Sequence, residues 1–517
     1  MGIMDALKNE AANTNLVETE NGALGFANHQ SDIVDFFYKI SSMRQADPLT
    51  KKTMFLKAAA EDKELAYRML FFSRDIRGGL GERKLFRDIY SSLDKAVIDA
   101  TFKLIPEYGR WDDLIDLLLV PSINSDTKDK IFTFIWDTLQ NDLDCMGDGR
   151  SCSLLAKWLP SVRKVSKEKV RLAKMILSHW GWTEKLYRKT LSKLRGYIKV
   201  VEKDMTANNW GDINFGAVPS KAAKNYREAF KKHDAERYNA YLEGLKNGTE
   251  KVNAAAIYPY EIVTSYCGTF RYIKDEDTFL EQQWKALPLP KNGILGNAIV
   301  VRDGSGSMQS QISGNTTALS VATSLAILMS ENLKGEFKDR FITFSQNPKF
   351  VDLGACTSLK QKLEISFREA ECSNTDIEKT MDLILRTVVK NNIPQEEIPA
   401  VVIISDMEFD QARGCYSWTY GYGLNKTSSS EDTLFAIIGK KWQDAGYQLP
   451  KIVFWNVASR TGAVPMQENK NGLLLVSGFS QNILDMLSEG GTMLDIIRKK
   501  LMTKRYDCIG DAIKSIV

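Results

Sequence analysis

The pattern of apolar residues changes at residues 287–293, and this change constrains the fold more than any other feature of the sequence. Before it, apolar residues recur every three or four positions, which predicts helices. After it, short apolar runs alternate with helical stretches. The region of change contains Pro288, Pro290 and Gly293, which are typical of a domain boundary. Because 517 residues are too many for one hydrophobic core, we expect an all-α domain followed by an α/β domain.

The helical half is interrupted by glycine or proline roughly every 20–30 residues, a rhythm typical of antiparallel helix pairs that stack as a HEAT-like solenoid. Helices are predicted at residues 32–40, 55–72, 85–93, 130–143 and 167–177. The first 28 residues contain acids and lack a continuous apolar core. We therefore expect a flexible arm at residues 1–28 and the helical-repeat domain at residues 29–290.

The C-terminal part, residues 291–517, alternates strands with helices. Strands are predicted at 297–301, 339–344, 400–404, 451–457 and 473–476, with helices at 317–332, 376–390, 431–445 and from 481 onward. Fully apolar strands that alternate with helices predict a Rossmann-like parallel sheet that is covered on both faces. In such sheets ligands bind beyond the carboxyl ends of the strands.

Side chains that carry oxygen follow two of these strands. The run Asp303-Gly304-Ser305-Gly306-Ser307 comes directly after the first strand, and Asp406 comes just after the strand at 400–404. Asn374-Thr375-Asp376 stands between them, at the start of a predicted helix. A hard divalent cation prefers oxygen ligands, and the glycines let the first turn curl tightly. The alternative is that the run is only a flexible turn and that Thr375 and Asp406 are helix caps.

The order and strand context of these residues resemble the metal-ion-dependent adhesion site of a von Willebrand factor A (vWA) domain. In that family a D-x-S-x-S turn, a later Thr and a later Asp hold one Mg²⁺ or Mn²⁺. The matching positions here are Asp303, Ser305, Ser307, Thr375 and Asp406. The resemblance implies an ion with one position left for water or a partner's carboxylate. No base with a nucleophile accompanies the motif, so we assign no catalytic residue.

The loop after Asp406 carries further acids and a group of aromatic residues. Glu408 and Asp410 follow closely, and both could join the outer shell of the metal. Residues 415–423 then place four aromatic residues among small ones. This composition is typical of a contact surface, and equally of a loop that packs over its own domain.

A basic block lies in the helical half. Residues 151–232 contain 19 Lys and Arg against 6 Asp and Glu, whereas the whole chain has a net charge of only +4. Tryptophans and tyrosines are interleaved with the cations. Cations neutralise phosphates and exposed aromatics stack unpaired bases, so the block favours RNA binding. The residues selected for this role are Arg163, Lys164, Arg188, Lys189, Lys193, Arg195, Lys221 and Lys224. The alternative is that the cations are solvated helix faces and that the aromatics are core residues.

Three stretches of the helical half resemble the TROVE module of the Ro autoantigen family. They are residues 74–87 (RDIRGGLGERKLFR), 108–114 (YGRWDDL) and 187–195 (YRKTLSKLR). The chain is more similar still to an uncharacterised relative family with the same two-part layout, as in residues 218–226 and 405–409. The Ro resemblance implies a ring of helical repeats that binds small noncoding RNAs and is joined to a vWA domain.

These patterns favour a non-enzymatic noncoding-RNA-binding protein whose vWA domain holds Mg²⁺ or Mn²⁺ and an acidic group of a protein partner. The alternative is a structural or assembly protein, including one in a virus particle, that uses the metal site for subunit contacts. A metal-dependent nuclease or phosphatase is disfavoured, because one metal cage is visible without a base or nucleophile.

Seven scattered cysteines without a C-x-x-C pair predict a reducing, cytoplasm-like compartment. No apolar stretch reaches the length of a membrane span, so we expect no membrane contact. An oligomer is compatible with the sequence, and a place in a virion stays open.

Overall fold

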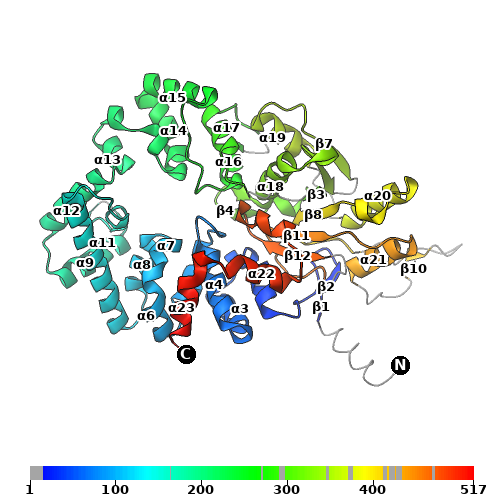
Figure 1. Ribbon diagram of the computed structural model, residues 1–517, viewed down its shortest axis with the longest axis horizontal. Helices are drawn as coiled ribbons and strands as arrows, with labels where there is room; N and C mark the ends of the chain where they lie inside the picture. The colour runs from blue at the N-terminus through cyan, green and yellow to red at the C-terminus, as the bar shows by residue number, and fades with distance from the viewer. Residues whose placement is uncertain are drawn as a thin grey trace. The chain divides into compact units, whose positions relative to one another are not determined.

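The computed structural model divides into two compact units (Figure 1). The described residues are 15–163, 165–268, 272–289, 297–344, 348–370, 376–411, 416–417, 425–426, 433–467 and 472–516. The sheet unit consists of the described parts of Met1–Asp47, Met54–Lys63 and Ile257–Leu501. The helical unit consists of the described parts of Pro48–Thr53, Glu64–Ala256 and Met502–Val517.

The helical unit is an array of helices, most of which pack against neighbours that are close in sequence, although its last helix packs against one near residue 100. Its main helices are α4 (Lys63–Arg74), α5 (Arg83–Tyr90), α6 (Lys95–Thr101), α8 (Trp111–Ile115), α9 (Ser125–Gly147), α10 (Leu155–Trp158), α11 (Lys167–Trp180), α12 (Glu184–Tyr197), α13 (Val201–Thr206), α14 (Ser220–His233), α15 (Ala235–Asn247) and α23 (Asp507–Lys514). α9 contacts α6, α10, α11 and α12, and α14 packs against α15. This confirms the all-α prediction for the N-terminal half.

The predicted helix at 55–72 is wrong in one respect, because the structure has two helices there. α3 (Pro48–Glu61) ends before Asp62, and α4 begins at Lys63. Aspartate disfavours a helix interior because its short polar side chain competes for the backbone hydrogen-bonding groups. The apolar spacing alone continued smoothly across this break.

The sheet unit is built on six strands in the order β12-β11-β8-β3-β6-β7. Their bounds are β3 (Ala298–Asp303), β6 (Arg340–Phe344), β7 (Lys349–Asp352), β8 (Ala400–Ser405), β11 (Ile452–Asn456) and β12 (Leu473–Ser477). All pairs are parallel except β6 with β7. The Rossmann-like α/β prediction is therefore confirmed. The edge strand β7 was not predicted, because only Val351 within it is buried and no apolar run marks it.

α18 (Ala318–Asn332) is the most buried helix along the sheet. It packs against β3, β6 and β8 and also against α16 (Pro259–Tyr266). Contacts with both the sheet and a second helix explain why its sequence, ALSVATSLAILMSEN, has no continuous polar face. The other helices of this unit are α2 (Asp32–Lys39), α17 (Thr278–Lys285), α19 (Leu359–Arg368), α20 (Ile377–Lys390), α21 (Leu434–Asp444) and α22 (Met493–Leu501). α2 and α22 contact β12, and α20 packs against α21. The helix predicted from 481 is a 3₁₀ helix at Gln481–Ser488.

The predicted flexible arm is wrong for its described part, residues 15–28. Strands β1 (Leu16–Glu18) and β2 (Leu24–Phe26) form an antiparallel hairpin. The backbone of Phe26 exchanges two hydrogen bonds with that of Val464, at 2.8 and 2.7 Å, and Gly22 forms a bridge with Asp410. The hairpin is held by backbone pairing, which leaves no apolar signature in the sequence. Residues 1–14 lie outside the described part of the chain.

The predicted segments 29–290 and 291–517 divide the chain at a single point. In the structure, each unit instead consists of three separate segments of the chain. The described parts of Met1–Asp47 and Met54–Lys63 belong to the sheet unit, where Ser41 N donates to Ser477 Oγ at 3.0 Å. The last residues belong to the helical unit, where Arg505 Nη2 donates to Asp75 Oδ1 at 2.6 Å. Such pairings between distant positions cannot be read from local pattern. Of the helices described, none is long and apolar enough to cross a membrane.

Candidate metal centre and basic helical surface

The D-x-S-x-S turn begins on the last residue of β3. Asp303 is fully buried. Its Oδ1 accepts a hydrogen bond from Ser305 N at 2.9 Å, and its Oδ2 accepts one from Ser405 Oγ at 2.6 Å. The hydroxyls of Ser305 and Ser307 lie 3.0 Å apart. The turn therefore gathers one carboxylate and two hydroxyls at the carboxyl end of the strand, where the fold places ligands.

The second carboxylate comes from the neighbouring strand. β8 pairs with β3, so Asp406, directly after β8, arrives at the same edge of the sheet. Asp406 is only 1% exposed. Its Oδ1 accepts a hydrogen bond from Glu408 N at 3.3 Å. Its Oδ2 is buried and has no hydrogen-bond partner among the described residues, with Arg460 Nη2 3.6 Å away. A buried carboxylate oxygen without a hydrogen bond is costly, and a cation would satisfy it.

The electrostatics of this pair also fit a cation. Burial raises the pKa of Asp303 to about 7, and the charge of Asp406 adds to the effect. Burial likewise raises the pKa of Asp406, while the Ser307 hydroxyl partly lowers it. Two carboxylates that disfavour each other's charge are stabilised by a divalent ion between them. The oxygen-only donor set suits Mg²⁺ or Mn²⁺.

Thr375, the fifth predicted ligand, lies outside the described residues. Asp376, the next residue, caps α20 by accepting a hydrogen bond from Lys379 N at 3.1 Å. Within the described chain there is no group of three or more His, Cys, Asp or Glu side chains arranged to hold a metal. The donors gathered here are two carboxylates, with hydroxyls as the remaining oxygens, so the assignment of the five ligands stays a prediction.

Glu408 has a structural role that the sequence did not indicate. It is completely buried. Its Oε1 accepts hydrogen bonds from Arg460 N at 2.8 Å and Thr461 N at 3.0 Å, and its Oε2 accepts one from Glu20 N at 2.9 Å. With both oxygens engaged, Glu408 holds the N-terminal hairpin and the loop at 459–461 together. The aromatic loop at 415–423 lies outside the described residues except for the backbone of Tyr416–Ser417.

The eight cations selected for RNA fall into different groups. Arg188, Lys189 and Lys193 are exposed on α12 and form no ion pair with another described residue. Arg163 is exposed but lies 3.4 Å from Glu184. Lys221 and Lys224 are half-buried at the start of α14. Lys164 lies outside the described residues.

Arg195 does not belong to this exposed set, although it was selected. Its Nε donates to Ala156 O at 2.7 Å and its Nη2 donates to Leu159 O at 2.8 Å, so it caps the end of α10. Burial lowers its pKa. A guanidinium used in this way stabilises the packing of α10 on α12 and is not available to a phosphate.

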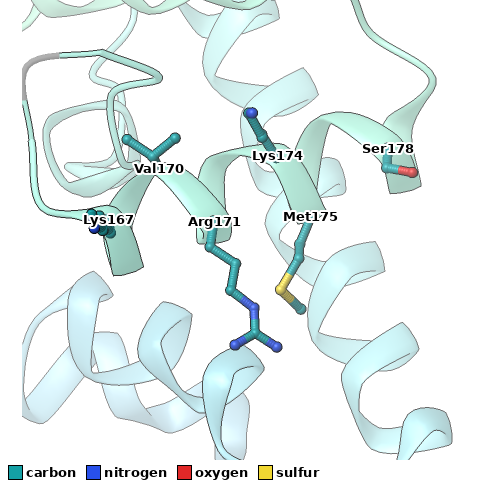
Figure 2. A pocket seen from close by; sticks show the side chains of 6 residues that line it. All are labelled: Lys167, Val170, Arg171, Lys174, Met175 and Ser178. Atoms are coloured by element: carbon teal, nitrogen blue, oxygen red, sulfur yellow. The ribbon is translucent and has the colours of Figure 1, made fainter.

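α11 presents a second basic face, which was not among the selected residues. Lys167, Arg171 and Lys174 are exposed and form no ion pair within the described chain. They surround a shallow cavity of about 470 Å³. Figure 2 shows the side chains that line it, namely Lys167, Val170, Arg171, Lys174, Met175 and Ser178. Their spacing of three and four positions puts them on one face of the helix, which is the signal that could have found them.

The interleaved tryptophans are mostly occupied with one another. Trp136, Trp180 and Trp182 are half-buried and pack edge to face, with ring centroids 5.3 to 5.7 Å apart. The Trp158 ring lies 5.1 Å from the guanidinium of Arg110. For these residues the core interpretation holds better than the base-stacking one.

Two of the stretches that resemble the Ro family form a buried ionic network. Arg74 donates to Asp113 at 2.6 Å, and Arg87 donates to the same carboxylate at 2.6 Å. Arg83 pairs with Asp112 in the same cluster. Gly79, in the first of these stretches, has a separate steric role, because a side chain there would clash with the backbone oxygen of Phe72. These motifs therefore have a structural explanation that does not require a ligand.

Comparison with known proteins finds similarity to two domain families and to one viral protein. Residues 297–507 match a domain of unknown function, DUF7788, and residues 128–289 match another, DUF2828. The uncharacterized protein L728 of Acanthamoeba polyphaga mimivirus is 30% identical over 514 residues, covering 91% of this chain and 84% of the relative. A crystal structure of the Ro (RSR) protein of Deinococcus radiodurans covers 87% of this chain and 92% of its own, with 12% identity and a TM-score of 0.36. A structural likeness this distant supports no inference about function.

Proposed function

The chain belongs to the same family as the mimivirus protein L728, and from the geometry above we propose that it is a binding protein with two separate sites. The sheet unit holds one Mg²⁺ or Mn²⁺ and uses it to bind an acidic group of a partner. The helical unit binds noncoding RNA through its exposed cations. The proposal assigns no catalytic step to either site.

The metal site rests on one observation above all. Asp406 Oδ2 is buried without a hydrogen bond within the described chain, beside a second buried carboxylate, Asp303, and the hydroxyls of Ser305 and Ser307. Asp303, Ser305, Ser307, Thr375 and Asp406 would hold the ion. When bound, the ion would supply an open coordination position for a partner's carboxylate. Two protein carboxylates leave a divalent ion able to accept a further anionic ligand.

Titration with Mn²⁺ tests this site. The wild type should bind one ion and unfold at a higher temperature in its presence, because a ligand that binds only the folded state stabilises it. Asp303→Asn and Asp406→Asn should lose both effects. Asp352→Asn, which changes an exposed carboxylate on β7, is the matched control. Unchanged Mn²⁺ affinity in Asp303→Asn would show that the ion does not bind here.

The RNA site rests on the unpaired cations of α11 and α12. Arg188, Lys189 and Lys193 on α12, with Lys167, Arg171 and Lys174 on α11, project into solvent without an acidic partner among the described residues. Paired cations gain little from a phosphate, because an existing ion pair must first be broken. Unpaired ones release counterions from the nucleic acid directly.

Reversal of Arg188, Lys189 and Lys193 to Glu should abolish binding of structured RNA. In the wild type, affinity should fall steeply with salt, and each lost phosphate contact should reduce the slope by about 1. Reversal of Lys334, Lys338 and Lys390, which are exposed on the sheet unit, is the matched control. Equal RNA affinity in the two triple variants would remove α12 from the binding surface.

A further inference from the structure

The tip of the N-terminal hairpin is fixed beside the metal-site carboxylates. Glu20 N donates to Glu408 Oε2 at 2.9 Å, and Thr19 Oγ1 donates to Phe409 O at 2.6 Å. Asn21 Nδ2 donates to Glu408 O at 2.6 Å. These bonds join the turn between β1 and β2 to the loop that directly follows Asp406. A segment almost 400 residues away in sequence is therefore part of the surroundings of the site.

Arg460 connects this hairpin to the site. Its Nη2 lies 2.8 Å from Glu20 Oε2 and 3.6 Å from Asp406 Oδ2. The backbone of Arg460 is held in turn, because Arg460 N donates to Glu408. The side chains of Arg460 and Glu20 are 40% and 45% exposed, whereas that of Asp406 is 1% exposed. The pair thus lies where the buried site meets solvent.

The charges suggest what this pair does. The two negative charges of Asp303 and Asp406 would neutralise the charge of a divalent ion. The positive charge of Arg460 is then neutralised by Glu20. An acidic group that approaches the ion from solvent meets the same guanidinium. An arginine can bind a carboxylate with two parallel N–H groups, which gives it geometric selectivity for such a group.

We propose that Arg460 binds the carboxylate of the partner beside the metal ion, and that Glu20 occupies Arg460 until the partner replaces it. The partner it fits is a protein segment with an accessible Glu or Asp. This inference rests on the proposed metal-dependent docking, and it adds a recognition residue and an internal competitor to it.

The geometry allows Glu20 to leave without undocking the hairpin. The hairpin is attached by the Glu20 backbone, by Thr19 and Asn21, and by the strand pairing of Phe26 with Val464. None of these attachments uses the Glu20 side chain, which pairs with Arg460 instead. An exposed ion pair of this kind is weak enough to exchange.

The test uses the full-length protein, Mn²⁺ and a fluorescent hexaglutamate peptide, with a hexaglutamine peptide as the neutral control. Glu20→Gln should bind hexaglutamate roughly two- to fivefold more tightly than the wild type, because the competing ion pair is gone. Arg460→Ala should bind it at least about threefold more weakly. At the same time Arg460→Ala should bind Mn²⁺ as tightly as the wild type or more so, since a cation next to Asp406 has been removed. Glu18→Gln, an exposed acid on the same hairpin, should change neither affinity.

The outcomes separate the inference from the function it rests on. Wild-type protein that binds no Mn²⁺ would overturn the metal site and this inference with it. Mn²⁺ binding with hexaglutamate affinity that is unchanged in both Glu20→Gln and Arg460→Ala would overturn the inference alone. Hydrogen exchange of residues 16–26 in Glu20→Gln is the control for docking of the hairpin, and it should match that of the wild type. With the hairpin docked, hexaglutamate binding by Glu20→Gln that is weaker than that of the wild type would also count against the inference.

Discussion

Asp113 is fully buried in the helical unit, and the guanidinium groups of Arg74, Arg83 and Arg87 converge on it. Burial alone would raise the pKa of Asp113, but Arg74 and Arg87 hold it below its ordinary value. Asp113→Ala leaves buried cations without their shared anion, so we expect it to lower the unfolding free energy by about 3–5 kcal/mol. Asp116→Ala, at the more exposed edge of the cluster, should cost clearly less. Urea unfolding of the two variants measures the difference, and equal losses would contradict the central role of Asp113.

Asp35 gives a pH dependence with a defined sign. Burial raises the pKa of Asp35 from 3.8 to about 6 in the folded protein, and Lys39 only partly offsets this. The folded state therefore holds a proton that the unfolded state releases. The stability from Asp35 is complete below its unfolded pKa and is lost as the pH rises through about 6.

Comparison with Asp35→Asn isolates this contribution. From about pH 5 to about pH 7.5 the wild type should lose on the order of 1 kcal/mol of unfolding free energy relative to Asp35→Asn. Denaturant unfolding at both pH values measures it. A difference between the two proteins that does not change with pH would show that Asp35 titrates normally.

Candidate site residues could be predicted from the sequence where polar side chains stand at the end of an apolar strand. Asp303 and Asp406 could be brought together because each stands at the carboxyl end of an apolar strand, and the structure places both at one edge of the sheet. Arg460 and Glu20 could not be found, because no local pattern connects them with Asp406. Arg195 was selected for its charge alone, and only its contacts reveal that it caps a helix.

At the scale of elements, the C-terminal segment belongs to the helical unit. Arg505 and Tyr506 both donate hydrogen bonds to Asp75, which is fully buried. Arg505→Ala removes the counter-charge of a buried carboxylate, so we expect a loss of roughly 2 kcal/mol of unfolding free energy. Lys504→Ala, an exposed neighbour, should have almost no effect. Limited proteolysis and thermal unfolding of both variants compare them, and equal stability would place Arg505 outside the stabilising contacts.

Elements with a strong apolar period were predictable, and those held by pairing were not. The strands β3, β8, β11 and β12 are apolar runs, and the helices α9 and α11 have regular apolar spacing, so all were identified with boundary shifts of a few residues. The N-terminal hairpin is held by backbone pairing with residues that are distant in sequence. β7 is an edge strand that is held by its pairing with β6. The side chains of β7 are mostly exposed and the strand residues of the hairpin are mostly half-buried, so neither leaves a continuous apolar run in the sequence.

At the scale of the molecule, the two proposed sites lie in different compact units. Each should therefore be lost without the other. Asp303→Asn should lose Mn²⁺ binding and keep its RNA affinity, whereas the triple reversal on α12 should lose RNA and keep Mn²⁺. Parallel Mn²⁺ titration and RNA filter binding of both variants provide the readout. Loss of both activities in either variant would contradict the assignment of separate sites.

The most direct test of the RNA-binding account is the nucleic acid carried by the purified full-length protein. The ultraviolet absorbance ratio is measured after a low-salt wash and after a high-salt wash, and the bound nucleic acid is sequenced. We predict RNA that remains at low salt and is removed at high salt, because phosphate contacts dominate the affinity. Protein that carries no RNA, fails to bind added structured RNA and forms Mn²⁺-dependent oligomers would contradict this account and indicate an assembly protein instead.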